Sequence, residues 1–252
     1  MTLPKLVTPE YTLLLPSTQE EVKFRAFLVK EQKVLMIAQA SGDEKMIAEA
    51  LSSLVSDCTF GTVDASKNPM FDIEYVFLQI RAKSVGSNVE LTVLCPDDDV
   101  TPVQIQVSLE DIGIQTDVTH TNEYNLTDDI KVTFRYPRLK DIQNLQVGST
   151  EFERMTKLVN HCIDSVETPD EVINHVDMTA AEIEEFIDSF NTVQIEAVMN
   201  FFETMPKVRH VVEVTNPVTG VKGEVLLEGI ESFLEKPFLM IISKTIIRQI
   251  LH

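Results

Sequence analysis

Tryptophan is absent from this 252-residue chain, and cysteines and long apolar runs are few. The three cysteines, Cys58, Cys95 and Cys162, lie far apart and form no Cys-x-x-Cys pair. This excludes a disulfide framework and a complete zinc ribbon, and it fits a reducing cytosol. The longest apolar runs, such as Phe238 to Ile242, have five residues, whereas a membrane span needs about 20. The first ten residues lack an apolar core, so we expect neither a signal peptide nor a membrane span.

Basic residues are also few, because 21 Lys and Arg stand against 40 Asp and Glu, a formal net charge of -19. Such a surface repels the phosphates of nucleic acids and anionic lipids, so we expect no nucleic-acid partner. The acidity either serves solubility alone or meets a basic surface on a partner, and composition does not decide between the two. The hydrophobic content of 44% predicts a folded chain, as one large domain or two small ones.

The motifs that carry common chemistries are missing. The sequence has no phosphate loop, no paired glycine fingerprint and no nucleophile elbow. Asp97-Asp98-Asp99 lacks the alternating oxygen ligands and the glycine of an EF-hand calcium loop, so we expect it to be a solvated loop tip. His161 adjoins Cys162, but neighbours on a helix do not share a face. The acidic residues between Glu182 and Asp188 lie on the polar side of an expected helix. We therefore expect no enzymatic activity, no cofactor and no metal.

Apolar spacing predicts an opening hairpin followed by helices and further strands. Tyr11 to Leu15 and the alternating stretch Glu20 to Phe27 are typical of two strands joined by a turn. Lys30 to Gln39 fits either a helix or a strand. Cap signals and apolar spacing predict helices that begin at Ser41, Asn68, Thr150, Thr168 and Thr179 and one that carries Ile195 to Phe202. Further strands are predicted at Asn88–Leu94, Val103–Leu109, Ile130–Tyr136, His210–Thr215 and Lys222–Leu227.

Together these elements predict an α+β fold with an N-terminal hairpin plus helices, two knuckle-like β hairpins and a small helical subdomain. The change between strand-like and helix-like apolar patterns along the chain predicts four consecutive blocks. Residues 1–90 form an N-terminal α+β block and residues 91–149 a β-rich, knuckle-like block. Residues 150–206 form the helical subdomain, and residues 207–252 a β hairpin with an apolar C-terminal segment.

The two knuckle-like hairpins resemble each other. In each, a strand leads to a proline-bearing loop, Cys95 to Pro102 in one and Asn216 to Gly220 in the other, and the second strand ends in Leu-Glu-x-Ile. The layout is similar to a rubredoxin-type zinc knuckle from which the cysteines are missing, since only Cys95 stands where a ligand belongs. One thiolate cannot replace the four ligands of a structural zinc site, so we expect plain hairpins. The likeness is either an internal repeat or chance convergence on hairpin chemistry.

The C-terminal segment is dense in apolar side chains for a chain end, where fraying is usual. As a helix it would have an apolar face too wide for one solvated surface. Either the core of the protein covers this face or a partner does, by helix-in-groove docking. The candidate partner-binding residues are Phe238, Leu239, Ile241, Ile242, Ile246, Ile247, Ile250 and Leu251.

Several N-terminal motifs, in order along the chain, resemble the T-even-type bacteriophage baseplate hub protein family. The resemblance is close over residues 1 to about 95 and weaker in the helical subdomain. The segments that carry it are Leu3-Pro4-Lys5-Leu6, Arg25 to Leu35, Cys58-Thr59-Phe60-Gly61, Phe71 to Phe77 and Arg81 to Gly86. The family includes a hub subunit and a hub assembly factor that are similar to each other.

The resemblance implies a structural or assembly component of the baseplate hub of a contractile-tailed phage, which acts by binding other tail or hub proteins and not by catalysis. The alternative is a transient tail-assembly chaperone, for example for the tape-measure protein, that is absent from the mature virion. Either role places the protein in the host cytoplasm during assembly, and the first also places it in the virion tail baseplate. The oligomeric state stays open.

Overall fold

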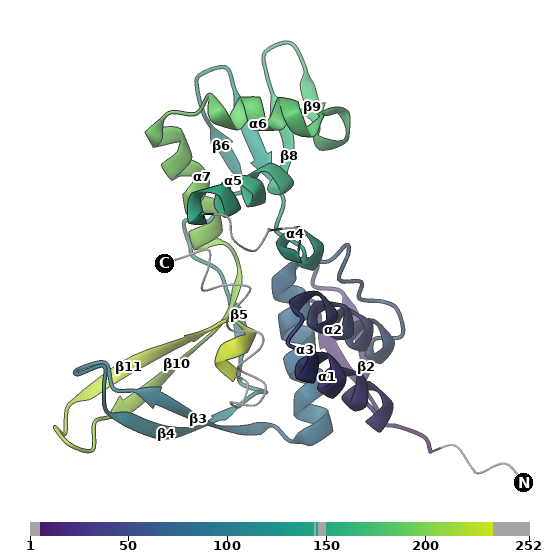
Figure 1. The fold of residues 1–252 in the computed structure, drawn as a ribbon, viewed down its shortest axis with the longest axis vertical. Helices are drawn as coiled ribbons and strands as arrows, with labels where there is room; N and C mark the ends of the chain where they lie inside the picture. Colours follow the sequence, from purple (N-terminus) through teal and green to yellow (C-terminus); the bar gives the residue numbers. More distant parts are fainter. Residues whose placement is uncertain (1–5, 144, 146–149, 234–252) are drawn as a thin grey trace, which may run out of the picture. The chain divides into compact units, whose positions relative to one another are not determined.

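The computed structural model describes residues 6–143, 145 and 150–233. These residues form two compact units. Of the described residues, the first unit comprises those up to Gln115 and those from Lys207 to Phe233, and the second comprises those within Thr116–Pro206. Helices and small antiparallel sheets occur in both units (Figure 1), so the predicted α+β class is confirmed.

The first unit opens with the predicted hairpin. Strand β1 (Glu10–Leu14) pairs antiparallel with β2 (Glu21–Arg25), and Val22 and Phe24 turn inward. Helices α1 (Val29–Ser41), α2 (Glu44–Cys58) and α3 (Met70–Val85) follow. The segment that fitted helix or strand is therefore a helix. Helix α2 is capped by the side chain of Asp43, which accepts from the backbone N of Lys45 at 2.9 Å, and not by Ser41 as predicted.

Helix α3 lies at the centre of the core of this unit. Apolar residues on two of its faces are buried: Phe71, Leu78 and Ala82 form one apolar stripe along the helix, and Ile73, Phe77 and Ile80 form the other. Asp72 in its first turn is fully covered and accepts from the Ser17 backbone N at 3.0 Å and from the Ser17 hydroxyl. Burial raises the pKa of Asp72 above its usual value despite these hydrogen bonds.

Two long hairpins complete the first unit. Strand β3 (Asn88–Leu94) pairs with β4 (Pro102–Ser108), and β10 (Lys207–Thr215) pairs with β11 (Lys222–Glu228). Strand β5 (Gly113–Gln115) adds to the second hairpin in the order β11-β10-β5, and the short 3-10 turn η2 (Ile230–Phe233) follows β11. Figure 1 shows the two hairpins side by side with their tips at the same end. Both predicted hairpins are confirmed.

The second unit is a four-stranded antiparallel sheet covered by helices. Its strands, in the order in which they pair, are β6 (Glu123–Asn125), β7 (Lys131–Phe134), β8 (Ile163–Glu167) and β9 (Val172–Asn174). Its helical elements are α4 (Leu139–Gln143), α5 (Glu151–Cys162), η1 (His175–Asp177), α6 (Ala180–Asp188) and α7 (Thr192–Thr204). Side chains from the sheet and from α5, α6 and α7 share one core, which includes Phe134, Val159, Ile183 and Phe201.

The helix predicted to start at Thr168 is wrong. Residues Thr168 to Glu171 form the tight turn between β8 and β9, in which the Thr168 backbone N donates to the Glu171 carbonyl at 2.9 Å. The cap-like sequence is present, but Val172 and Ile173 are β-branched and pair with Glu167 and Val166 of β8. Residues 150–206, which were predicted to form a helical subdomain, therefore also contribute the strands β8 and β9 to the sheet. No helix in the described ranges is long and apolar enough to cross a membrane.

Candidate protein-binding surface

The residues predicted from the sequence to bind a partner all lie outside the described residues. They are Phe238, Leu239, Ile241, Ile242, Ile246, Ile247, Ile250 and Leu251. The docking role of this C-terminal segment stays a prediction. Within the described part of the chain, helix α1 carries the surface that departs most from an ordinary solvated helix.

Helix α1 is apolar on the face that points away from the core. Its buried face holds Leu35 and Ala38. On the opposite side, Val29, Met36 and Ile37 have exposed fractions of 65%, 57% and 63%. A surface helix normally has its polar residues on this side. We name these three residues the outer face of α1.

The exposed charges on α1 are of one sign. Lys30 and Lys33 are exposed, whereas Glu31, the acidic residue of the helix, is buried. In a chain with a net charge of -19 this helix therefore presents a locally basic and apolar surface. Such a combination favours a partner segment that is apolar in its centre and acidic at its edges.

A buried ion pair fixes the first turn of α1. Glu31 Oε1 lies 2.9 Å from Arg25 Nη2 and 3.1 Å from Lys30 Nζ, and Glu31 Oε2 accepts from the Leu28 backbone N at 2.6 Å. Arg25 also donates to the Asp57 carbonyl at the end of α2, at 3.3 Å. The pair therefore joins β2, α1 and α2, and it holds the outer face of α1 in a fixed orientation.

Opposing effects set the pKa of Glu31. Burial alone disfavours the charged carboxylate, but the hydrogen bonds from Arg25, the Leu28 backbone and Lys30 outweigh it and lower the pKa of Glu31. The neighbouring thiol of Cys58 behaves differently, because burial raises its pKa to about 11. Cys58 is therefore a neutral core residue and not a nucleophile.

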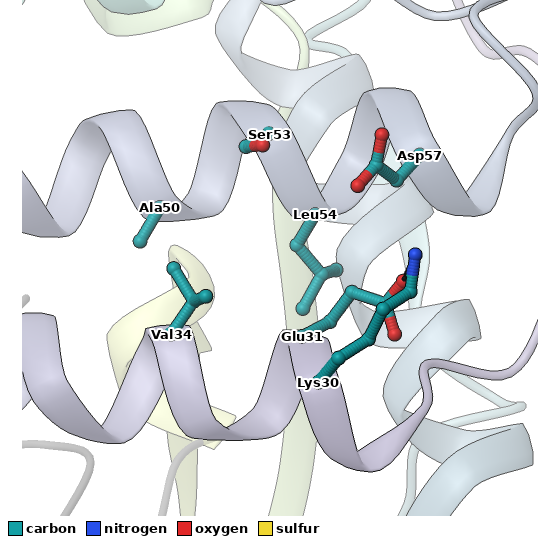
Figure 2. A pocket seen from close by; sticks show the side chains of 7 residues that line it. All are labelled: Lys30, Glu31, Val34, Ala50, Ser53, Leu54 and Asp57. Carbon is teal, nitrogen blue, oxygen red and sulfur yellow. Dashed lines mark ion pairs between the residues drawn. The ribbon is translucent and has the colours of Figure 1, made fainter.

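A small hollow lies between α1 and α2 beside the outer face. Figure 2 shows Val34 of α1 pointing across to Ala50 of α2, with Lys30 and Glu31 near Asp57 at one end. Its volume is about 110 Å³, roughly that of three or four molecules of liquid water. It is apolar at one end and charged at the other, so it could accept one side chain of a docked segment but is too small for a cofactor.

The other features noted in the sequence do not form a site. Asp97 and Asp98 are exposed, as predicted for a loop tip, but both accept hydrogen bonds from Asn216. Complete burial raises the pKa of Cys162, so this thiol stays protonated in the core beside His161. In the part of the chain that the structure describes, no group of three or more His, Cys, Asp or Glu side chains gathers where it could hold a metal ion.

The sequence did not reveal the outer face of α1, because the spacing of apolar residues in this segment fits both a helix and a strand. Val34, Leu35, Met36, Ile37 and Ala38 are five consecutive apolar residues, which cover both the buried and the exposed side of a helix. Once the segment is known to be a helix, the excess of apolar residues on the side opposite Leu35 becomes visible.

A model of the T4 bacteriophage base plate protein family matches residues 8–235. The chain belongs to this family. The resemblance inferred from the N-terminal motifs is thereby confirmed, and the match also covers the second unit, where the motifs resembled the family only weakly.

One base plate relative is the baseplate hub assembly protein gp26 of Enterobacteria phage T4. It is 24% identical over 215 residues, which cover 85% of this chain and 92% of the relative. No solved structure matches the chain. The match covers nearly the whole of the relative, so it is not confined to one of the two units.

Proposed function

We propose that this base plate protein acts in the assembly of the baseplate hub of a contractile-tailed phage, as a binding protein without catalytic activity. The family match and the name of the relative, a hub assembly protein, support this role. The observation that carries the binding mode is the outer face of α1, three exposed apolar side chains on a helix whose exposed charges are both positive.

The partner that fits this face is an amphipathic helix of another baseplate or tail protein, with an apolar stripe bordered by Asp or Glu. Val29 and Ile37 are eight residues apart, a span of about 12 Å at 1.5 Å per residue. That length matches two turns of a partner helix docked side by side. Lys33 lies among these residues and would pair with an acidic edge.

The proposal is tested by combining Met36→Ser with Ile37→Ser in a phage that lacks its own copy of the gene and is complemented from a plasmid. Loss of infectious particles with an unchanged melting temperature of the purified protein is expected. The matched control combines Val176→Ser with Val193→Ser, two exposed valines of the second unit. Normal particle yield from the Met36 and Ile37 variant would refute the use of this face.

The partner is identified by cross-linking mass spectrometry through Lys33 during infection. Cross-links to an acidic helix of another tail protein are expected, and Lys33→Glu should abolish the interaction. Cross-links to a second copy of this chain alone would contradict the proposed partner.

A structural subunit and a transient assembly factor differ in whether they stay in the particle. The name of the relative favours an assembly role, and we propose that the protein acts in the host cytoplasm before the tail is complete. Mass spectrometry of purified virions separates the two roles. A fixed copy number in the virion indicates a hub subunit, whereas absence indicates an assembly factor or a chaperone.

A further inference from the structure

The loops of the two long hairpins share one backbone hydrogen bond, from the N–H of the fifth loop residue to the carbonyl of the first. In the first loop the Cys95 backbone N donates across the loop to the Thr101 carbonyl at 2.9 Å, and the Asp99 backbone N donates back to the Cys95 carbonyl at 2.8 Å. In the second loop Asn216 takes the place of Cys95. Its carbonyl accepts from the Gly220 backbone N at 2.9 Å, and its backbone N donates to the Val221 carbonyl at 2.9 Å, five residues on instead of six. The two loops therefore align over their first five positions, and the first loop has one more residue before its second strand begins.

The backbone conformation follows the same alignment. Asp99 and Gly220, each the fifth residue of its loop, have φ angles of 55° and 74°. Both loops therefore have a left-handed residue at this position, which glycine adopts readily and aspartate adopts less often. Pro96 and Pro217 occupy the second position of each loop.

The fourth residue of each loop also has the same role. Asp98 accepts from the Val100 backbone N at 3.0 Å, and Thr219 accepts through its hydroxyl from the Val221 backbone N at 3.3 Å. Each side chain thus accepts from the amide two residues further on. The two loops thus agree in the bond from the fifth residue to the first, in the left-handed fifth residue and in this side-chain bond. The agreement favours an internal repeat.

The tips of the two hairpins are joined by side chains from the aligned loops, a group of four residues that we name the clasp. Asn216 Nδ2 donates to Asp97 Oδ1 and to Asp98 Oδ2, both at 2.9 Å. The Thr219 hydroxyl donates to Asp97 Oδ2 at 2.7 Å. Because these bonds join residues more than 100 positions apart, they hold one hairpin against the other.

The first and fourth positions of the two loops have the spacing of a four-ligand metal site. Cys95 and Asp98 in one loop, and Asn216 and Thr219 in the other, are each separated by two residues. A structural zinc site takes two ligands at this spacing from each of two loops. The Asn216 Oδ1 atom accepts from the backbone N of Val218 at 2.8 Å and of Thr219 at 3.3 Å. The side chain at the first loop position is therefore surrounded by backbone N–H donors of its own loop.

We infer that the two hairpins are copies of one structural unit, and that the clasp joins their tips at the place where a tetrahedral metal would join them. The natural chain needs no metal there, because the side chains at 97, 98, 216 and 219 bond to one another directly. Positions 95, 98, 216 and 219 become a zinc site once all four carry thiolates.

Hydrogen bonding lowers the pKa of both carboxylates of the clasp. Thr219 and then Asn216 contribute most at Asp97, and Thr101 contributes most at Asp98. Both groups therefore stay charged, and able to accept these bonds, at neutral and mildly acidic pH.

The triple variant Asp98→Cys, Asn216→Cys, Thr219→Cys of the full chain, which retains Cys95, tests the placement of the four positions. The reduced protein is titrated with cobalt(II) and then with zinc. We expect the absorption of a tetrahedral thiolate site and about one metal ion per chain. The matched control moves one cysteine out of register, with Asp99→Cys in place of Asp98→Cys. Equal binding by the control, or no binding by a folded triple variant, would overturn the alignment.

Asn216→Asp tests the clasp without metal, and it applies even where the triple variant fails to fold. The aspartate keeps an oxygen for the amides of its own loop but loses the Nδ2 donor and places a third carboxylate against Asp97 and Asp98. Amide hydrogen exchange should accelerate in both loops, including at Val100 in the loop of the other hairpin. The control Val218→Ala, at an exposed position of the same loop, should leave both loops unchanged. Faster exchange in the loop of Asn216 alone would show that the hairpins are not joined there.

Discussion

At the scale of single residues, Phe77 contributes most plainly to stability. Its side chain is 1% exposed in the middle of α3, among residues that are buried on both of the apolar stripes. Phe77→Ala should reduce the free energy of unfolding by about 3–5 kcal/mol, the range for truncating a buried aromatic. Urea denaturation measures the change. Val85→Ala, at an exposed position of the same helix, should stay within about 0.5 kcal/mol, and a similar effect of both changes would contradict the central place of Phe77.

Glu31 shows how a buried charge is maintained. Glu31→Gln leaves Arg25 without its anionic partner, and breaking a buried ion pair costs about 3–5 kcal/mol at neutral pH. Lys30→Gln removes only the exposed partner of the same carboxylate and should cost less than about 1 kcal/mol. Chemical denaturation of the two variants and the natural protein separates these contributions, and equal losses would contradict the dominance of the buried pair.

The Glu31 pair also predicts a pH dependence. The pKa of Glu31 is lower in the folded protein than its ordinary value of 4.5, so the unfolded chain binds the proton more tightly. The stabilisation is therefore fully present above pH 4.5 and is lost as the pH falls through the lower, folded pKa. The stability difference between the natural protein and Glu31→Gln should shrink in acid, as measured by denaturation at a series of pH values. A difference that is constant down to pH 3 would refute the electrostatic origin.

At the scale of elements, the start of α2 is set by one side chain. Asp43 Oδ1 accepts from the backbone N of Lys45 and of Met46, at 2.9 Å and 3.3 Å. Asp43→Ala should therefore cost about 0.5–2 kcal/mol, whereas Asp43→Asn keeps an acceptor and should cost less. Thermal unfolding of the two variants tests this, and equal losses would mean that the charge, and not the cap bond, stabilises this end.

The elements that were predicted correctly are those with a strong local signal. The N-terminal hairpin, α3 and the two long hairpins each combine regular apolar spacing with clear turn or cap residues. The prediction failed at Thr168 because a cap-like sequence is also compatible with a tight turn, and only the pairing of β8 with β9 decides between them. The segment that became α1 stayed ambiguous because its apolar residues are consecutive. The local spacing of apolar residues does not determine the secondary structure of such segments, because contacts with distant parts of the chain decide it.

The surface and the clasp depend on contacts that no local pattern contains. Asn216 lies 119 residues from Asp97, so their hydrogen bonds follow only from the meeting of two hairpin tips. The sequence did predict the likeness of the two loops and the absence of a full cysteine set. It did not predict that polar side chains would join the tips in place of a metal.

At the scale of the whole molecule, the second unit is inserted into the first. The chain leaves the first unit after Gln115 and returns at Lys207, and these two residues are direct antiparallel partners in the pairing of β5 with β10. Within the second unit, the Asp117 backbone N donates to the Thr204 carbonyl at 3.3 Å, so its two ends are also close to each other. The division into four consecutive blocks, made from the apolar patterns of the sequence, stays a prediction.

An inserted unit with neighbouring ends predicts that each unit folds without the other. The core of the second unit is built from its own sheet and helices, including Phe134, Ile183 and Phe201. Residues 116–206 should therefore give a cooperative thermal transition and dispersed amide signals as an isolated polypeptide.

The remaining chain should fold when residues 116–206 are replaced by Asn-Gly, because a two-residue turn can join directly paired antiparallel strands. The strand pairing of Gln115 with Lys207 then continues into the new turn. Circular dichroism and amide exchange of the shortened protein should match those of the same elements in the full chain. A shortened protein that stays folded but no longer supports phage growth would assign an essential part of the function to the inserted unit. If both pieces stay unfolded while the full chain folds, then the two units stabilise each other, and the insertion is not an independent domain.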